Sequence, residues 1–120
     1  MADITDAQVE AWVAQYVHAW ETGEAVDIRK LFTEDAEWHE WPYETHWEGL
    51  DKIVEGWQSR AGWQEGGWSF TWKPLTINGD TFAIEGIGAY TKLGNFKNLW
   101  VVTLADDGRA SVFRHWNNEV

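Results

Sequence analysis

The sequence predicts an α+β fold in which helices cover one face of an antiparallel sheet. Three segments with helical spacing of apolar residues occupy the first half of the chain, with one strand-like segment among them. Four strand-like segments separated by turns fill the second half. Helices that precede a run of strands are typical of the α+β class. The chain has 120 residues, the size of one domain, so we expect residues 1–120 to form a single domain.

The first predicted helix follows Thr5. Thr5 and Gln8 have the spacing of a capping box, in which each residue caps the backbone of the other. Gly23 suits the left-handed position that ends a helix. Between them runs an apolar stripe at helical spacing, made of Val9, Trp12, Val13, Tyr16, Val17 and Trp20.

The middle of the chain alternates between helix and strand. Residues 26–32 predict a short second helix, and residues 36–41 predict an aromatic strand that stops at Pro42. Residues 43–49 are expected to form a loop. Apolar residues return at helical spacing in 50–61, which predicts a third helix.

Four strands are expected to follow as a meander. They cover residues 68–77, 81–92, 96–104 and 110–118, and turn residues such as Asn78-Gly79 separate them. A strongly curved sheet of this kind encloses a cavity between its concave face and the helices.

Composition restricts the functions that are open to the chain. The formal net charge of −11 would repel phosphate backbones and anionic membranes, so we expect no nucleic-acid or membrane partner. There is no cysteine, which excludes disulfides and thiolate metal sites. The sequence has no pattern of a signal peptide or membrane helix, and we expect a cytoplasmic protein.

Eleven tryptophans are unusual in a chain of this length. A tryptophan ring fills a large volume, and its N–H needs a partner when it is buried. Two interpretations stay open: the rings fill a packed core, or they line a cavity.

Two stretches carry a family resemblance, "LFTEDAEWHEWP" (31–42) and "EGLDKIVEGW" (48–57). With the order of elements, they resemble the NTF2-like superfamily, and within it the SnoaL-like and ketosteroid isomerase-like proteins. The resemblance covers nearly the whole chain. It implies a cone in which the curved sheet wraps around three N-terminal helices and an internal cavity. It specifies the activity only weakly, because this fold hosts isomerases, cyclases, dehydratases and non-catalytic proteins.

The resemblance also suggests roles for individual residues. Ketosteroid isomerases use a carboxylate base and an oxyanion hole. The base position falls on Glu40, five residues after Asp35, and the oxyanion tyrosine falls on Tyr16. The second oxyanion donor falls near Trp100, a departure, because an indole donates a hydrogen bond but cannot act as a general acid.

Strand alternation sorts the candidate side chains. Glu40 and Trp38 share one face of their strand, and His39 shares the other face with Trp41. A carboxylate that loses its hydration among indole rings accepts a proton more readily, which suits a base. His115, in the last strand, is the rival base.

A metal site is not expected. His39, Glu40 and His46 match no zinc signature, because six residues separate the two histidines. The sequence also lacks the glycine-rich motifs of nucleotide-binding proteins, so we expect no cofactor. Gly86 and Gly88 share a strand face, where they open space for a ligand or bend the sheet.

These observations predict a protein that binds a hydrophobic, aromatic or polycyclic small molecule. As an enzyme it would use cofactor-free acid–base chemistry for isomerisation, cyclisation or dehydration. Glu40 or His115 would take the proton, and Tyr16 would stabilise the oxyanion. The alternative is a non-catalytic binding module or a structural dimer with a tryptophan-filled core. The predicted ligand-binding residues are Trp12, Trp20, Trp38, Trp57, Ile84, Gly86, Gly88, Tyr90, Trp100, Phe113 and Asn117.

The sheet is expected to pair with a second copy through its outer face. Trp68, Phe70 and Trp72 alternate with polar residues, so one face of their strand is strongly aromatic. Leu99 and Val101 lie on the side of their strand that points away from the cavity. Three helices cannot cover both faces of the sheet, and large exposed apolar patches usually mark interfaces.

Overall fold

The computed structural model describes residues 3–119 and confirms the α+β class. The six strands form one sheet in the order β2-β1-β6-β5-β4-β3. Neighbouring strands are antiparallel except β1 and β6, which are parallel. The elements are α1 (Asp6–Thr22), α2 (Ala25–Arg29), β1 (Phe32–Trp41), β2 (Thr45–Glu48), α3 (Leu50–Ser59), the 3₁₀ helix η1 (Ala61–Gln64), β3 (Trp68–Asn78), β4 (Thr81–Tyr90), β5 (Gly94–Leu104) and β6 (Ala110–Glu119).

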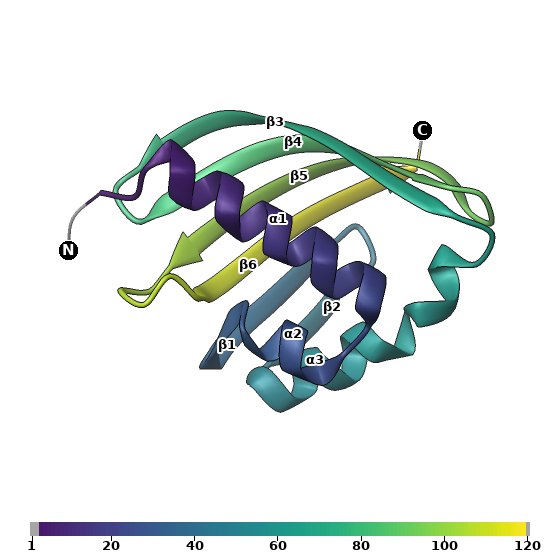
Figure 1. The fold of residues 1–120 in the computed structure, drawn as a ribbon, viewed down its shortest axis with the longest axis horizontal. Coiled ribbons are helices and arrows are strands. Elements are labelled where there is room, and N and C mark those ends of the chain that lie inside the picture. The colour runs from purple at the N-terminus through teal and green to yellow at the C-terminus, as the bar shows by residue number, and fades with distance from the viewer. Residues whose placement is uncertain (1–2, 120) are drawn as a thin grey trace.

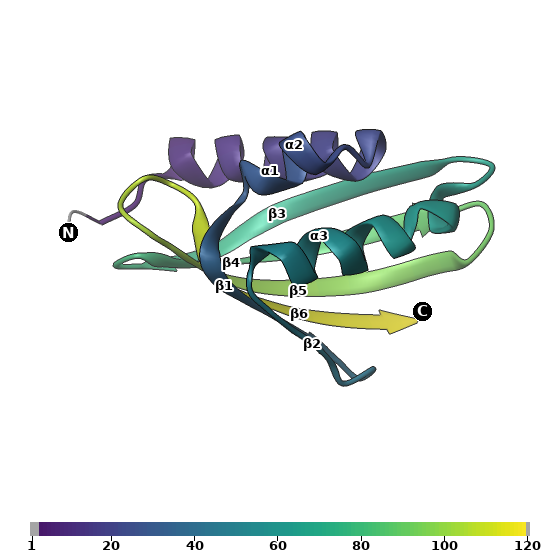
Figure 2. The ribbon, with the colours of Figure 1, turned by 90° about the horizontal axis from the view of Figure 1, so that it is seen from below.

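The helices lie on the concave side of the curved sheet (Figure 1). Helix α1 crosses the strands β3 to β6, and α3 lies closer to β1 and β2 (Figures 1 and 2). Between them is a core rich in aromatic rings, with the ring of Trp12 packed edge-on against Phe32, Phe82 and Trp100. No helix among residues 3–119 combines the length and apolarity needed to cross a bilayer.

Helix α1 has the ends that the sequence predicts. The Gln8 N–H donates to Thr5 Oγ1 over 3.2 Å, and the Thr5 N–H donates to Gln8 Oε1 over 2.8 Å. Gly23 ends the helix with φ of 65°, a backbone conformation that favours glycine. The apolar stripe faces the sheet and places Tyr16 and Trp20 at the centre of the fold.

Two predictions for the middle of the chain were wrong. Helix α2 ends at Arg29, and β1 begins at Phe32 instead of residue 36. Phe32 pairs with Ala110 of β6, and the Ala110 N–H donates to the Leu31 carbonyl over 2.7 Å. Contacts with the end of the chain therefore override the local helical pattern.

Residues 45–48, expected in a loop, form the edge strand β2. His46 pairs opposite His39, and Trp47 pairs opposite Trp38 with ring centroids 5.0 Å apart. Every second side chain of β2 turns inward, so Trp47 is half-buried against α3. A Cβ added at Gly56 of α3 would collide with the Trp47 indole, so this glycine lets the strand approach the helix.

The outer face of the sheet differs from the expected one. Trp68 and Phe70 point inward and line a pocket, and Trp72 packs against the core, so these rings leave no aromatic outer face. Leu99 does lie exposed on the outside, opposite Trp116 of β6. Dimerisation through this face stays a prediction, and sedimentation velocity of the purified protein tests it.

Candidate functional site

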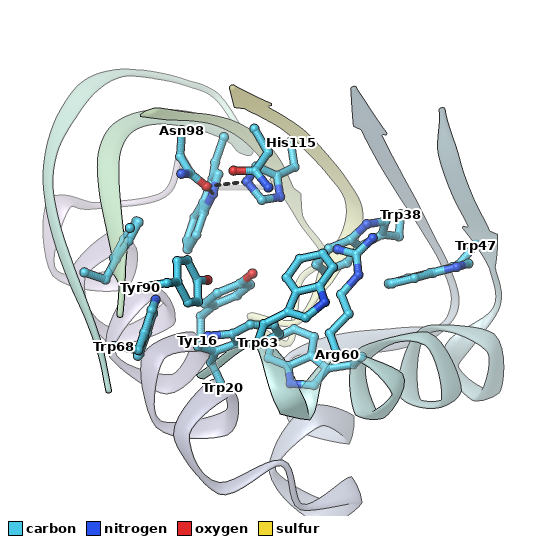
Figure 3. A pocket seen from close by; sticks show the side chains of 15 residues that line it. Tyr16, Trp20, Trp38, Trp47, Arg60, Trp63, Trp68, Tyr90, Asn98 and His115 are labelled. Atoms are coloured by element: carbon cyan, nitrogen blue, oxygen red, sulfur yellow. Dashed lines mark hydrogen bonds between the residues drawn. The ribbon is translucent and has the colours of Figure 1, made fainter. Parts of the chain in front are cut away.

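A small pocket lies between α1, α3 and the concave face of the sheet. Its volume is about 30 Å³, which leaves room for little more than one or two water molecules. Figure 3 shows Tyr16 and Tyr90 pointing into its middle, with Asn98 and His115 on one side and Arg60 on another. The lining residues are Tyr16, Trp20, Trp38, Trp47, Trp57, Arg60, Trp63, Trp68, Phe70, Gly88, Tyr90, Asn98, Trp100, His115 and Asn117.

Glu40 lies beside this pocket, buried under Arg60. Its side chain is fully buried, and Arg60 Nη1 donates to Glu40 Oε1 over 2.5 Å. Trp38 Nε1 donates to the same oxygen over 3.3 Å, and Asn117 Nδ2 donates to Oε2 over 3.4 Å. The prediction that Glu40 and Trp38 face inward is confirmed. However, the carboxylate is compensated by a cation and is not itself part of the pocket lining.

Arg60 separates the pocket from a larger opening at the surface. Its guanidinium carbon lies 4.8 Å from the Trp47 ring centroid and 4.6 Å from that of Trp63. The surface pocket beyond has a volume of about 400 Å³ and shares Arg60, Trp63 and Asn117 with the inner one. Arg60 and Trp63 therefore form a partition between the inner pocket and this vestibule.

His115 has a defined tautomer. Asn98 Nδ2 donates to the Phe96 carbonyl over 3.2 Å, and Asn98 Oδ1 accepts from Trp100 Nε1 over 3.4 Å. These contacts fix the orientation of the Asn98 amide. His115 Nε2 also binds Asn98 Oδ1, an acceptor, so Nε2 carries the proton.

The other nitrogen of His115 is therefore a free lone pair. Nδ1 is buried without a hydrogen-bond partner. Burial lowers the pKa of His115 from 6.5 to about 4, with Arg60 adding to the shift and Glu40 opposing it. The imidazole is neutral at pH 7 and can accept a proton.

Hydrogen-bond donors gather opposite His115. Burial, followed by the neighbouring Tyr90 and Glu40, raises the pKa of Tyr16 well above its ordinary value. Burial also raises the pKa of Tyr90 to about 12, although the indole N–H groups of Trp68 and Trp20 oppose the shift. Both phenols therefore stay protonated at neutral pH, as donors must.

The structure brings most of the predicted site residues to the pocket but not all. Trp12 belongs to the core, where its Nε1 donates to the Leu31 carbonyl over 3.1 Å. Ile84 and Phe113 are fully buried core residues outside the lining. Gly86 makes room for the Phe70 ring, into which an added Cβ would project, so it opens no space for a ligand.

Gly88, in contrast, lies at the pocket as predicted. An added Cβ there would lie 3.2 Å from Tyr90 Cε2 and 3.9 Å from Asn98 Nδ2. This glycine therefore contributes to the open volume.

Two polar residues of the site were missed from the sequence. Arg60 follows Trp57 by three residues, which places both on one helix face and could have indicated a buried cation. Asn98 lies two residues before Trp100 on a strand, so it shares the inward face. Residues of both types are usually exposed, so composition alone does not indicate that these two are buried.

Chemically, the residues of the pocket combine one unpartnered proton acceptor with several hydrogen-bond donors. The acceptor is His115 Nδ1, and the donors come from Tyr16, Tyr90 and the indoles. Such an arrangement can take a proton from carbon and stabilise the negative charge that develops on a carbonyl oxygen.

Comparison with known proteins identifies the family. The model of the SnoaL-like domain matches residues 13–117. No curated protein matches the sequence.

Solved structures share the NTF2-like cone fold. A proposed isomerase of the SnoaL-like family from Agrobacterium tumefaciens is 15% identical to this chain, with a TM-score of 0.74. The superposition covers 93% of this chain and 98% of the Agrobacterium chain. A proposed ketosteroid isomerase from Kribbella flavida is 16% identical, with a TM-score of 0.73. The superposition covers 95% of this chain and 80% of the Kribbella chain. A SnoaL-like protein of unknown function from Burkholderia thailandensis is 18% identical, with a TM-score of 0.75. The superposition covers 96% of this chain and 98% of the Burkholderia chain.

Proposed function

Because the chain belongs to the SnoaL-like domain family, we propose that it is a cofactor-independent acid–base enzyme of the isomerase type. Its substrate class is a small apolar molecule with a carbonyl group. The observation that supports this most is the unpartnered, buried Nδ1 of His115, a residue that lines the same pocket as Tyr16 and Tyr90. The similarity to a proposed isomerase and a proposed ketosteroid isomerase supports the same class.

The reaction begins when a base removes a proton from the carbon next to the carbonyl. The electron pair of the broken C–H bond moves into the enolate, whose oxygen becomes negative. Tyr16, which is buried, and Tyr90, which is partly buried, are both protonated and donate hydrogen bonds to that oxygen with little reorganisation. The protonated base then returns the proton to a different carbon, which completes an isomerisation. Cyclisation and dehydration begin with the same enolate.

Two residues can serve as the base, in different states of the pocket. His115 is one candidate, because its Nδ1 has no hydrogen-bond partner and its imidazole is neutral, but this nitrogen is buried and the pocket must open over it before a substrate can reach it. Glu40 can act as the base only after the Arg60 side chain moves away, because Arg60 is hydrogen-bonded to its carboxylate. A ligand that enters from the vestibule and displaces the Arg60 side chain would expose Glu40.

The volumes limit how a substrate can bind. A polycyclic molecule does not fit the inner pocket of about 30 Å³. The carbonyl end of a substrate would occupy the inner pocket, and its apolar body would lie in the vestibule of about 400 Å³, against Leu93, Phe96 and Trp63. Binding therefore requires Arg60 and Trp63 to move.

Turnover of cyclohex-3-en-1-one to its conjugated isomer, followed by ultraviolet absorbance, tests the proposal. The wild type should accelerate this reaction, and Tyr16→Phe should lower kcat by about 10²-fold. His115→Gln and Glu40→Gln separate the two bases, since only the loss of the base in use costs roughly 10²-fold. Absence of catalysis for a panel of small ketones, or turnover that survives both base variants, would sink the acid–base mechanism.

One observation favours a second function, a non-catalytic binding module. Seven tryptophan rings line the inner pocket and leave little free volume, as a packed core would. In that case small ketones would quench tryptophan emission without being converted.

A further inference from the structure

The outer face of the β1–β2 hairpin carries a cluster of histidines and glutamates outside the pocket. His39 of β1 pairs directly opposite His46 of β2, and Glu37 pairs directly opposite Glu48. Side chains two residues apart on a strand share a face, so all four lie together. The chain spacing of the two histidines matches no zinc signature, and only the pairing of the strands brings them together.

The ligand atoms are close to the spacing that a metal ion requires. His39 Nε2 lies 3.2 Å from Glu37 Oε1, and the imidazole rings of His39 and His46 stack with centroids 4.4 Å apart. One ligand atom from each of Glu37, His39 and His46 lies within 4.8 Å of the other two. Tetrahedral coordination at zinc separates ligand atoms by roughly 3.3 Å. The half-exposed His46 ring must also leave its stacked position and rotate, because an imidazole nitrogen binds a metal in the plane of its ring.

Glu48 can complete the coordination. Its Oε1 lies 3.4 Å from His46 Nε2, and its side chain is largely exposed, so it can turn toward a metal without disturbing the core. Zinc, with its preference for four nitrogen, sulfur or oxygen ligands, accepts two imidazoles and two carboxylates.

The surroundings also favour a cation. Two carboxylates directly opposite each other on paired strands repel, and an ion between them removes that repulsion. The one basic side chain that pairs beside His39 is Arg114 of β6, and its Nη1 points to Thr103 Oγ1 at 3.5 Å. On the other side, the Trp41 ring stacks on His39 at 5.8 Å and restricts its rotation.

We propose that Glu37, His39 and His46, with Glu48 as the fourth ligand, bind a divalent cation of the zinc type. The ligand set excludes magnesium and calcium as the preferred ions, because these take oxygen ligands almost alone. The site is independent of the acid–base pocket, since all four side chains point away from it. A bound ion would cross-link β1 and the edge strand β2, and would thereby stabilise the position of Trp47.

Isothermal titration of untagged protein with ZnCl₂ tests the proposal. We expect one zinc ion per chain, no comparable heat with MgCl₂, and a higher melting temperature in the presence of zinc. His39→Ala and His46→Ala should each weaken binding at least tenfold, and Glu37→Gln should weaken it while preserving the shape of the side chain. His18→Ala is the matched control, because His18 is exposed on α1 beside Asp27 and should leave the affinity unchanged.

A second titration with CoCl₂ reports the coordination directly. Cobalt in a tetrahedral nitrogen and oxygen site gives a visible absorption band, which should appear in the wild type and disappear in His46→Ala. Zinc affinity that is equal in the wild type and both histidine variants would overturn the proposal. The absence of zinc binding at micromolar concentrations would also overturn it. So would a loss of zinc affinity in His18→Ala equal to the loss in the two ligand variants.

Discussion

Arg60 and Glu40 form a buried ion pair that joins the end of α3 to the end of β1, the strand next to the edge of the sheet. The Arg60 guanidinium donates to the Glu40 carboxylate over 2.5 Å, and their side chains are 12% and 0% exposed. Arg60 also lies between the inner pocket and the vestibule. A movement of Arg60 that opens the inner pocket would therefore also leave the buried Glu40 carboxylate without its cation.

Breaking the ion pair from one side should be costly. Arg60→Met leaves the Glu40 carboxylate buried without its cation, and we expect a loss of about 3–5 kcal/mol in the free energy of unfolding. The double variant Arg60→Met with Glu40→Gln should recover much of that loss. Urea denaturation measures both.

Arg29→Met is the matched control for this experiment. Arg29 pairs with Asp51 over 2.7 Å, but the two side chains are 47% and 89% exposed. Exposed pairs contribute about 0–1 kcal/mol. Equal losses for Arg29→Met and Arg60→Met would show that the Arg60 pair has no special role in stability.

The buried His115 should make stability depend on pH. Its pKa is about 4 in the folded chain and about 6.5 when exposed, so the unfolded chain binds more protons between these values. The free energy of unfolding should therefore rise from pH 4 to pH 6.5, with about 3 kcal/mol attributable to His115, and gain nothing from it above that range.

The His115→Gln variant isolates this contribution. Urea denaturation at several pH values should show a flatter profile for His115→Gln than for the wild type. His18→Gln, at an exposed histidine, should keep the slope of the wild type. Parallel profiles for all three proteins would mean that His115 is not buried in its neutral form.

The two glycines of β4 should respond differently to added volume. Gly86→Ala forces a Cβ into the Phe70 ring and should destabilise the fold by about 1–3 kcal/mol. Gly88→Ala meets Tyr90 Cε2 at 3.2 Å and should cost less stability while reducing the pocket. Melting temperatures of the two variants distinguish them, and a greater loss for Gly88→Ala would contradict the geometry.

Local patterns were enough to predict α1, α3, the meander and the shared face of Trp38 and Glu40, whereas the inward direction of that face was implied by the family resemblance. The capping box of Thr5 and the alternation of Trp38 and Glu40 depend on residues close in the chain, so the sequence alone reveals them. The strand start at Phe32 depends on pairing with Ala110, which no local pattern encodes.

The candidate site was harder to predict because its key contacts are distant in the chain. Arg60 meets Glu40 across 20 residues, and Asn98 meets His115 across 17. The inward direction of Trp68 and Phe70 also could not be read from alternation, which separates two faces but does not say which one is inside.

Solvent exchange at a carbon next to a carbonyl tests the central claim most directly, because it detects enolisation itself. Cyclohexanone is incubated with the protein in D₂O, and proton NMR follows the loss of its α-protons. The wild type should accelerate exchange well above buffer, and Tyr16→Phe and one of the two base variants, His115→Gln or Glu40→Gln, should each lower the rate by about 10²-fold. Exchange at the buffer rate with the wild type, while cyclohexanone still quenches its tryptophan emission, would contradict the enzyme and leave a binding protein.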